Sequence, residues 1–387
     1  MARRSLIPPL AVAIPVRNEE ERIGSCLEAL AQQEGAAFDH VVLLLNNCSD
    51  ATLIHAQSLA PALPFTLTLV ERQYALERAH AGTARREAME VAADLVGPEG
   101  LLFTTDADGA VTPDWLIRTL AAFKAGAAVV CGRALIDAVD ALKIPASLHD
   151  DDAAEVAYGT LLDHIHHLTD PDPADPWPRH TEHSGASIAV RVSAWKCVGG
   201  IPAVPSSEDR AFVAALRRID MPIRHAPDVL VTVSGRTTGR AQGGMAETIA
   251  RRIHQQDEML DDALEPAVLC LKRAQARSAF RVLWNEYSPN HGLQMLQSFA
   301  SHLELTATEI AAWLDAPYFG QVWEAIERAS PALRRQRVKR SELTQHHAAA
   351  TAILKNLLAK NTLSTRSFLQ LPPPQSVTHS RERQSIR

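Results

Sequence analysis

The sequence predicts an α/β protein whose mostly parallel central sheet carries helices on both faces, followed by a helical C-terminal region. Short apolar runs alternate with segments of helical periodicity through the first half of the chain, which is the pattern of repeated strand–helix units. Polar clusters come directly after several of these runs, as they do where parallel strands end at a ligand site. After about residue 245 the strand-like runs give way to helical periodicity.

Short apolar or alternating runs predict strands at residues 10–16, 41–45, 65–71, 101–105, 127–132, 187–192 and 229–233. Apolar residues recur every three to four positions in the segments that we expect to be helical, residues 19–33, 51–60, 83–95, 113–125, 154–168 and 209–218. Residues 170–178 contain four prolines. Because proline cannot donate to a strand ladder or continue a helix, this segment is predicted to be an irregular loop.

These patterns divide the chain into three predicted parts. Residues 1–245 form the α/β domain, and residues 246–360 form the helical region, with an interruption at residues 288–292. Residues 361–387 are polar and contain three consecutive prolines, so we expect this tail to be disordered.

The composition sets limits on the partners of the protein. Of the 387 residues, 46% are hydrophobic and 22% charged, as in an ordinary soluble globular protein. The formal net charge of −6 provides no overall attraction to nucleic acid or to an anionic membrane, so local arginines must bind any polyanionic ligand. No apolar run is long enough to span a bilayer, and residues 10–16 read as a first strand because they contain a proline and lack a cleavage site. Five widely spaced cysteines without a C-x-x-C pattern favour reduced thiols and a cytoplasmic location.

Two carboxylates, Asp106 and Asp108, follow the apolar run at residues 101–105. Alternate residues of an extended chain point the same way, so both side chains reach one place beyond the end of the strand. Carboxylate oxygens suit Mg²⁺ or Mn²⁺, and an ion held in this way commonly carries a diphosphate. A simple turn containing two aspartates is the alternative.

Polar residues also follow the first two predicted strands. Pro15, Arg17 and Glu19 lie where the first strand ends, and Asn46 lies where the second ends. The crevice beyond the carboxyl ends of parallel strands is where such sheets bind ligands. An amide such as that of Asn46 can recognise a uracil or guanine edge, or a ribose. Each cluster could instead cap the helix that follows it.

The order of five motifs resembles the family 2 glycosyltransferases of the GT-A fold. The motifs are P-x-x-N-E at Pro15 to Glu19, N-N-C-[ST]-D-x-T at Asn46 to Thr52, G-x-A-R-N at Gly82 to Arg86, D-x-D at Asp106 to Asp108 and an E-D pair at Glu208 and Asp209. The resemblance spans roughly residues 8–240. It departs from the family at Asn46, where many members have aspartate, and at Arg86, where asparagine is usual.

The resemblance implies a site for a UDP- or GDP-linked sugar and a divalent cation, Mn²⁺ or Mg²⁺. It implies that the nucleoside lies among Pro15, Arg17, Glu19 and Asn46. Arg85 would approach the donor, and Asp106 and Asp108 would flank the sugar and the metal, with Asp108 as the more direct ligand.

The resemblance also assigns an acceptor side to the site. Residues 184–190 are small, which lets backbone and ligand approach closely, and they would place Gly185 and Ala186 there. In the family the aspartate of the E-D pair is the general base, here Asp209, with Glu208 beside it. His183 precedes the small segment and is a further candidate. A tight turn and a helix N-terminus rich in acids are the structural alternatives.

Residues 234–244 form a glycine-rich loop that contains Arg236 and Arg240. Its charge and expected mobility suit a lid that closes over a diphosphate, although a solvated loop has the same composition.

The predicted activity is an inverting, metal-assisted transfer of a sugar to an acceptor hydroxyl. A nucleotidyltransferase would typically carry a glycine-rich signature with a lysine after the first strand, which is absent. A scaffold protein that binds a nucleotide sugar without turnover is the other alternative. The absence of transmembrane segments and of a Q-x-x-R-W motif favours a single transfer to a small or soluble acceptor. The helical C-terminal region could cover the acceptor site or form a homodimer, and its periodicity does not decide between these roles.

Overall fold

The computed structural model describes residues 7–202, 204–240, 244–286 and 292–360. Its centre is an eight-stranded sheet with the order β3-β2-β1-β4-β7-β6-β8-β5. The strands are β1 (Leu10–Val16), β2 (His40–Asn46), β3 (Thr66–Arg72), β4 (Leu101–Thr104), β5 (Ala110–Val111), β6 (Val129–Ile136), β7 (Ile188–Arg191) and β8 (Ile223–Val233). The predicted α/β class is confirmed.

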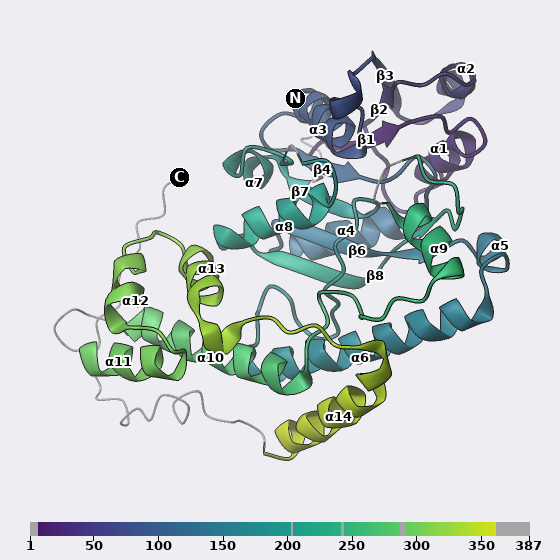
Figure 1. The fold of residues 1–387 in the computed structure, drawn as a ribbon. Coiled ribbons are helices and arrows are strands. Elements are labelled where there is room, and N and C mark those ends of the chain that lie inside the picture. The colour runs from purple at the N-terminus through teal and green to yellow at the C-terminus, as the bar shows by residue number, and fades with distance from the viewer. Residues whose placement is uncertain (1–6, 203, 241–243, 287–291, 361–387) are drawn as a thin grey trace.

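Helices cover this sheet and build the C-terminal region (Figure 1). The α-helices are α1 (Ile23–Ala31), α2 (Thr52–Leu59), α3 (Ala81–Val96), α4 (Trp115–Lys124), α5 (Ala138–Ala141), α6 (Ala146–Thr169), α7 (Val192–Cys197), α8 (Glu208–Arg218), α9 (Met245–His254), α10 (Ala267–Glu286), α11 (Leu293–His302), α12 (Ala307–Trp313), α13 (Phe319–Ala329) and α14 (Leu343–Lys360). Short 3₁₀ helices are η1 (Ala60–Ala62), η2 (Leu76–Arg78), η3 (Pro331–Leu333) and η4 (Arg340–Glu342).

The sheet is mostly parallel. β1 pairs in parallel with β2 and β4, β2 with β3, and β6 with β8. The antiparallel pairs are β4 with β7, β6 with β7, and β5 with β8. The sequence pattern did not predict β5, because two residues directly after Gly109 are too short a run to show periodicity.

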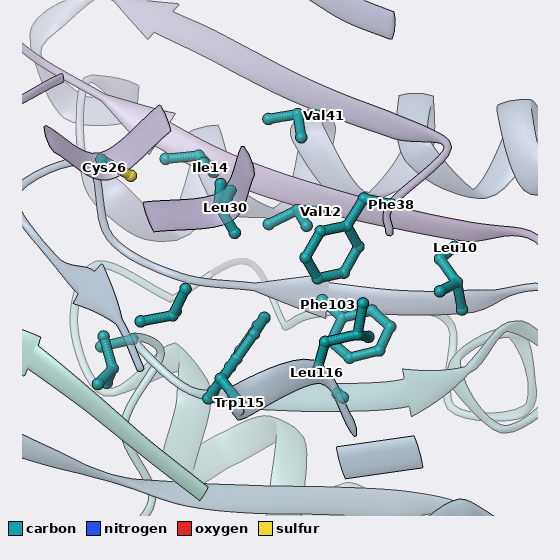
Figure 2. Packing of buried hydrophobic residues seen from close by; sticks show 14 of the residues in the cluster. Leu10, Val12, Ile14, Cys26, Leu30, Phe38, Val41, Phe103, Trp115 and Leu116 are labelled. Carbon is teal, nitrogen blue, oxygen red and sulfur yellow. The ribbon is translucent and has the colours of Figure 1, made fainter. Parts of the chain in front are cut away.

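Both faces of the sheet are buried, as expected for parallel strands covered by helices. Along β1, Val12 and Ile14 pack in one core with α1 and α4, whereas Ala11 and Ala13 pack in a second core with α3 and α8. Figure 2 shows the first of these cores. There, the ring of Phe103 lies 5.2 Å from that of Phe38 and 5.4 Å from that of Trp115, measured between ring centroids. This packing fixes the strands whose carboxyl ends carry the predicted site.

Two helix starts differ from prediction for reasons that involve distant residues. α1 begins at Ile23 instead of residue 19, because Asn18 adopts a positive φ of 55° and the amide of Glu19 donates to Thr52 Oγ1 at 2.8 Å. α6 begins at Ala146 instead of residue 154. The acidic first part of α6 is paired with the C-terminal region, since Arg340 lies 3.4 Å from Asp151.

The C-terminal helices pack around two further cores, one within α10 to α13 and one that joins α6, α10 and α14. In Figure 1, α10 to α13 gather at the lower left and α14 lies below α6, all of them away from β1 to β3. α13 also docks on the end of α8, where the amides of Phe319 and Gly320 each donate to Asp220 at 2.7 Å. None of the helices in the described ranges has the length and apolarity needed to cross a bilayer. The predicted disordered tail at residues 361–387 and most of the predicted interruption at residues 288–292 lie outside those ranges.

Candidate active site

The structure brings together motifs that lie more than 100 residues apart in the chain, and Arg85 on α3 connects them. Its guanidinium donates to Asp106 Oδ1 at 2.6 Å, Thr104 Oγ1 at 2.6 Å, the carbonyl of Gly185 at 2.8 Å and Glu208 Oε1 at 3.1 Å. The D-x-D end of β4, the small-residue segment and the E-D pair therefore meet around one buried cation.

Gly185 leaves the space that Arg85 occupies. A Cβ atom on Gly185 would lie 2.6 Å from Arg85 Cζ, closer than any non-bonded contact tolerates. Both Gly185 and Ala186 are buried. The glycine thus permits the close approach that the sequence pattern suggested, and the group that approaches is a side chain of the protein.

The acidic pair lies beside a third carboxylate. Asp108 Oδ2 is 3.0 Å from Arg236 Nη2, and Arg236 also makes a bidentate pair with Glu19 at 2.8 and 2.9 Å. Burial, together with the carboxylates of Asp106 and Glu19, raises the pKa of Asp108 to about 6 although Arg236 opposes the shift. Burial is the main cause of this shift, and repulsion from the two neighbouring carboxylates adds to it.

Whether a divalent cation fits depends on the carboxylate oxygens that Asp106 and Asp108 can offer. Asp106 Oδ1 is bound to Arg85, whereas Oδ2 has no partner among the described residues and the side chain is 35% exposed. Within the described ranges, no group of three or more His, Cys, Asp or Glu side chains is arranged to hold a metal. Two carboxylates suffice when phosphate oxygens and waters supply the other ligands, as is usual for Mg²⁺. Asp106 and Asp108 therefore fit a metal that arrives with a diphosphate.

The loop after β8 reaches over the end of β1. Arg236 and Arg240 both pair with Glu19, which is only 5% exposed. Asp140 on α5 holds the start of this loop, because it accepts bonds from the amide of Gly235 at 3.1 Å and from Ser234 Oγ at 3.3 Å. Both predicted lid arginines thus form ion pairs with Glu19, and Arg236 also contacts the predicted metal ligand Asp108.

Asn46 and its neighbour Asn47 have different roles. Asn46 is buried, and its Oδ1 has no hydrogen-bond partner among the described residues. Asn47 is committed to structure, since its side chain bonds both the amide and the carbonyl of Tyr74 at 2.9 Å. A buried acceptor without a donor is costly, so the Oδ1 atom of Asn46 is suited to accept a hydrogen bond from a ligand.

Pro15 is half-buried near the end of β1, where it pairs in register with Leu44. Arg17 donates from Nη1 to the carbonyl of Ala79 at 2.8 Å, which ties the first loop to the start of α3. Both residues therefore lie at the same edge of the sheet as Asn46.

Asp209 lies at the start of α8 and contacts the small-residue segment. Its Oδ2 accepts from the amide of Gly185 at 2.9 Å. Burial, and then the neighbouring Glu208, raises the pKa of Asp209 above its usual value. Ser207, which precedes the E-D pair, has a positive φ of 58°. Such a conformation costs energy for a non-glycine residue and is typical of functional sites.

His183 lies two residues before Gly185 in the chain. Its Nε2 is 3.1 Å from Nε2 of His225 on β8 and 3.3 Å from Arg217 Nη2 on α8. A surface cavity of about 440 Å³ between α4 and β8 contains none of the predicted site residues, and we place the site by side-chain convergence instead.

A comparison with protein-family models matches residues 11–181 to the model described as glycosyl transferase family 2. This segment of the chain is therefore similar to the family 2 glycosyltransferases. This confirms the resemblance drawn from the motifs and the GT-A fold that it implied. The match includes Arg85, Asp106 and Asp108, and Arg85 joins these matched residues of the glycosyltransferase domain to Gly185 and Glu208 beyond the matched segment.

Comparison with solved structures finds TarS of S. aureus with 16% identity, 91% coverage of this chain and a TM-score of 0.42. This chain spans 54% of the length of that TarS chain. A structure of TarS residues 1–349 in complex with UDP-GlcNAc has 17% identity, covers 91% of each chain and has a TM-score of 0.44. The mannosyltransferase PcManGT from Pyrobaculum calidifontis, in complex with GDP-Man and Mn²⁺, has 16% identity, 95% and 86% coverage and a TM-score of 0.42. The comparison with curated proteins finds no match.

Sequence reasoning missed three residues that contact members of the candidate site. Asp140 holds the loop that carries Arg236, and His225 and Arg217 surround His183. Neither Asp140 nor His225 belongs to a recognisable motif, and both act on residues at least 42 positions away. Arg217 lies on the predicted helix at residues 209–218, but its contact with β8 depends on the tertiary fold.

Proposed function

We propose that this protein transfers a sugar from a nucleoside-diphosphate donor to an acceptor hydroxyl with inversion at the anomeric carbon. The observation that carries the proposal is the connection, through Arg85, of Asp106 to Gly185 and Glu208. Donor-side and acceptor-side groups must lie together in any enzyme that joins two substrates. Arg85 acts as a positioning residue, because at least four of its N–H groups already serve the protein.

On the donor side, Asn46 Oδ1 accepts from the base or ribose, and Pro15 and Arg17 line the same edge of the sheet. Asp106 and Asp108 hold Mn²⁺ or Mg²⁺ together with the diphosphate. When bound, the cation offsets the negative charge that develops on the departing diphosphate. Arg236 and Arg240 exchange carboxylate partners for phosphate oxygens when the loop closes, since arginine forms bidentate pairs with either group.

On the acceptor side, Gly185 and Ala186 permit close approach of the acceptor. Asp209 takes the proton from the attacking hydroxyl, for which its raised pKa is favourable at neutral pH. The Gly185 amide orients the Asp209 carboxylate for this step.

The experiment that tests the proposal combines the purified protein with a panel of UDP- and GDP-linked sugars and Mn²⁺. Released nucleotide is measured with and without acceptors. We expect donor-dependent release from one nucleotide class. Binding of a donor without hydrolysis or transfer would instead indicate a scaffold protein, and release of pyrophosphate would indicate a nucleotidyltransferase.

Metal binding should depend on pH through Asp108. Because the pKa of Asp108 is raised to about 6, lowering the pH through this value protonates the carboxylate and removes a metal ligand. With nucleoside diphosphate present, we expect apparent Mn²⁺ affinity to fall about tenfold per pH unit below that pKa. Titrations followed by electron paramagnetic resonance measure the affinity. The Asp108→Asn variant should bind weakly throughout and lack this dependence, and an equal slope in both proteins would contradict the assignment.

Arg236→Gln should separate donor binding from metal binding. We expect the KM for the donor to rise about tenfold, because a charge-assisted bond to the diphosphate is lost. Affinity for Mn²⁺ should increase, since Arg236 no longer neutralises Asp108. The control is Arg328→Gln, whose side chain is 75% exposed at a distant helix. A variant with unchanged donor KM would show that the loop does not contact the donor.

A further inference from the structure

Arg217, near the end of α8, has no carboxylate partner among the described residues. Its Nη2 atom lies 3.2 Å from His225 Nε2 and 3.3 Å from His183 Nε2. Nε and Nη1 have no hydrogen-bond partner in the described part of the chain, and the residue is solvent-exposed. A guanidinium with free donors and accessible surface is able to bind an anion.

The two imidazoles beside Arg217 also contact each other. His225 Nδ1 lies 2.7 Å from Asp175 Oδ2 and is the donor there, which leaves Nε2 of the neutral ring as an acceptor. With the proton of a neutral His183 ring on Nε2, that atom donates to His225 Nε2 at 3.1 Å; with the proton on Nδ1, it accepts from Arg217 Nη2. Burial lowers the pKa of His183 to about 2 and that of His225 to about 4. The rings orient the guanidinium but supply no negative charge to balance it.

The acids near Arg217 are shared with other cations. Asp175 and Asp163 interact electrostatically with Arg217, but Asp175 pairs with Arg179 at 3.2 Å and with Arg224 at 3.3 Å, and Asp163 lies 3.7 Å from Arg179. This region is therefore electropositive, in a chain whose net charge is −6.

Arg217 contacts His183, a residue of the predicted acceptor side. His183 is two residues from Gly185, whose amide binds Asp209. Asp209 and Arg217 are eight residues apart on α8, which corresponds to about 12 Å along the helix axis. Arg217 is too far from Asp209 to contact the same hydroxyl. It can contact a remote group of the molecule that carries that hydroxyl.

We propose that Arg217, oriented by His183 and His225, forms a subsite for an anionic oxygen group, a phosphate or a carboxylate, on the acceptor. The assignment to the acceptor rests on the proposed function, whereas the anion site stands on its own contacts. The glycosyltransferase would thereby select charged acceptors over neutral ones of similar shape.

The first experiment titrates protein labelled with ¹⁵N-histidine with sodium phosphate, and separately with sodium acetate, at constant ionic strength. We expect the His183 and His225 ring resonances to shift, with the tighter-binding anion indicating the group. In Arg217→Gln the affinity should fall at least tenfold. Arg218→Gln is the matched control, because its side chain is 47% exposed and pairs with Glu324 on the surface. If neither anion moves these resonances in the wild-type protein, the subsite does not exist, whether or not the variant folds.

The second experiment compares each sugar with its phosphorylated and carboxylated forms as acceptors. We expect the charged form to have a KM at least tenfold lower in the wild type and in the Arg218→Gln control, and Arg217→Gln to abolish this difference. Equal KM values for charged and neutral acceptors in the wild type would overturn the acceptor assignment. If no donor turns over at all, the proposed function fails, and the titration alone decides the anion site.

Discussion

Replacing Asp209 with asparagine should lower kcat about 10³-fold, the contribution expected of a positioned general base. Asparagine preserves the size of the side chain but cannot accept the proton of the acceptor hydroxyl. Asp106, which we propose holds the donor, contacts Arg85 and not Asp209, so the KM for the donor should change less than threefold, a margin of roughly 0.6 kcal/mol. Steady-state rates of nucleotide release measure both constants.

The control for Asp209→Asn is Asp228→Asn, which alters an aspartate whose side chain is 54% exposed and which pairs with Arg118. The pH profile offers a second check. Because the pKa of Asp209 is raised by burial and by Glu208, wild-type kcat/KM should fall as the pH drops through a value above that of an ordinary aspartate. The variant should lose the contribution of Asp209 to that limb, while the fall caused by protonation of Asp108 remains. A kcat within tenfold of wild type would mean that Asp209 is not the base.

Replacing Arg85 with methionine should destabilise the fold by about 3 kcal/mol and abolish transfer. Arg85 is 4% exposed and lies between Asp106 and Glu208, whose side chain is 10% exposed. Removal of one partner from a buried ion pair leaves an uncompensated charge, which costs more than the pair contributed. The free energy of unfolding, measured by urea denaturation, tests the stability effect.

Arg118→Met is the matched control for Arg85→Met. Arg118 also bonds two carboxylates, Asp114 at 2.6 Å and Asp228 at 2.8 Å, but its side chain is 41% exposed. Exposed pairs contribute about 0–1 kcal/mol, so this variant should remain close to wild type. Equal losses of stability in the two variants would contradict the positioning role of Arg85.

The periodicity of the first half identified the parallel sheet, because strands buried on both faces must be apolar throughout and the helices between them must be amphipathic. The polar clusters after β1, β2 and β4 located the edge of the sheet at which ligands bind, because parallel strands end together. This reasoning needs only local composition. It could not place the antiparallel β7 between β4 and β6, since strand order depends on long-range pairing.

Local sequence patterns could not predict which charged side chains pair with each other in the candidate site. Glu19 is predicted to lie beside the nucleoside, and in the structure it is paired with Arg236, 217 residues away. Arg85 is predicted to approach the donor, and its described partners all belong to the protein. Distance in sequence carries no information on which cation meets which carboxylate.

The order of motifs along the chain was sufficient to identify the glycosyltransferase domain, since each motif sits at a strand end or a helix start whose position the backbone pattern dictates. Tertiary structure alone decided that Arg85 contacts two carboxylates, whereas Arg217 contacts none in the part of the chain that the structure describes. The physical reason is that a side chain's electrostatic partners are chosen by packing of elements such as α8 against β8, and these contacts leave no periodic trace in the sequence.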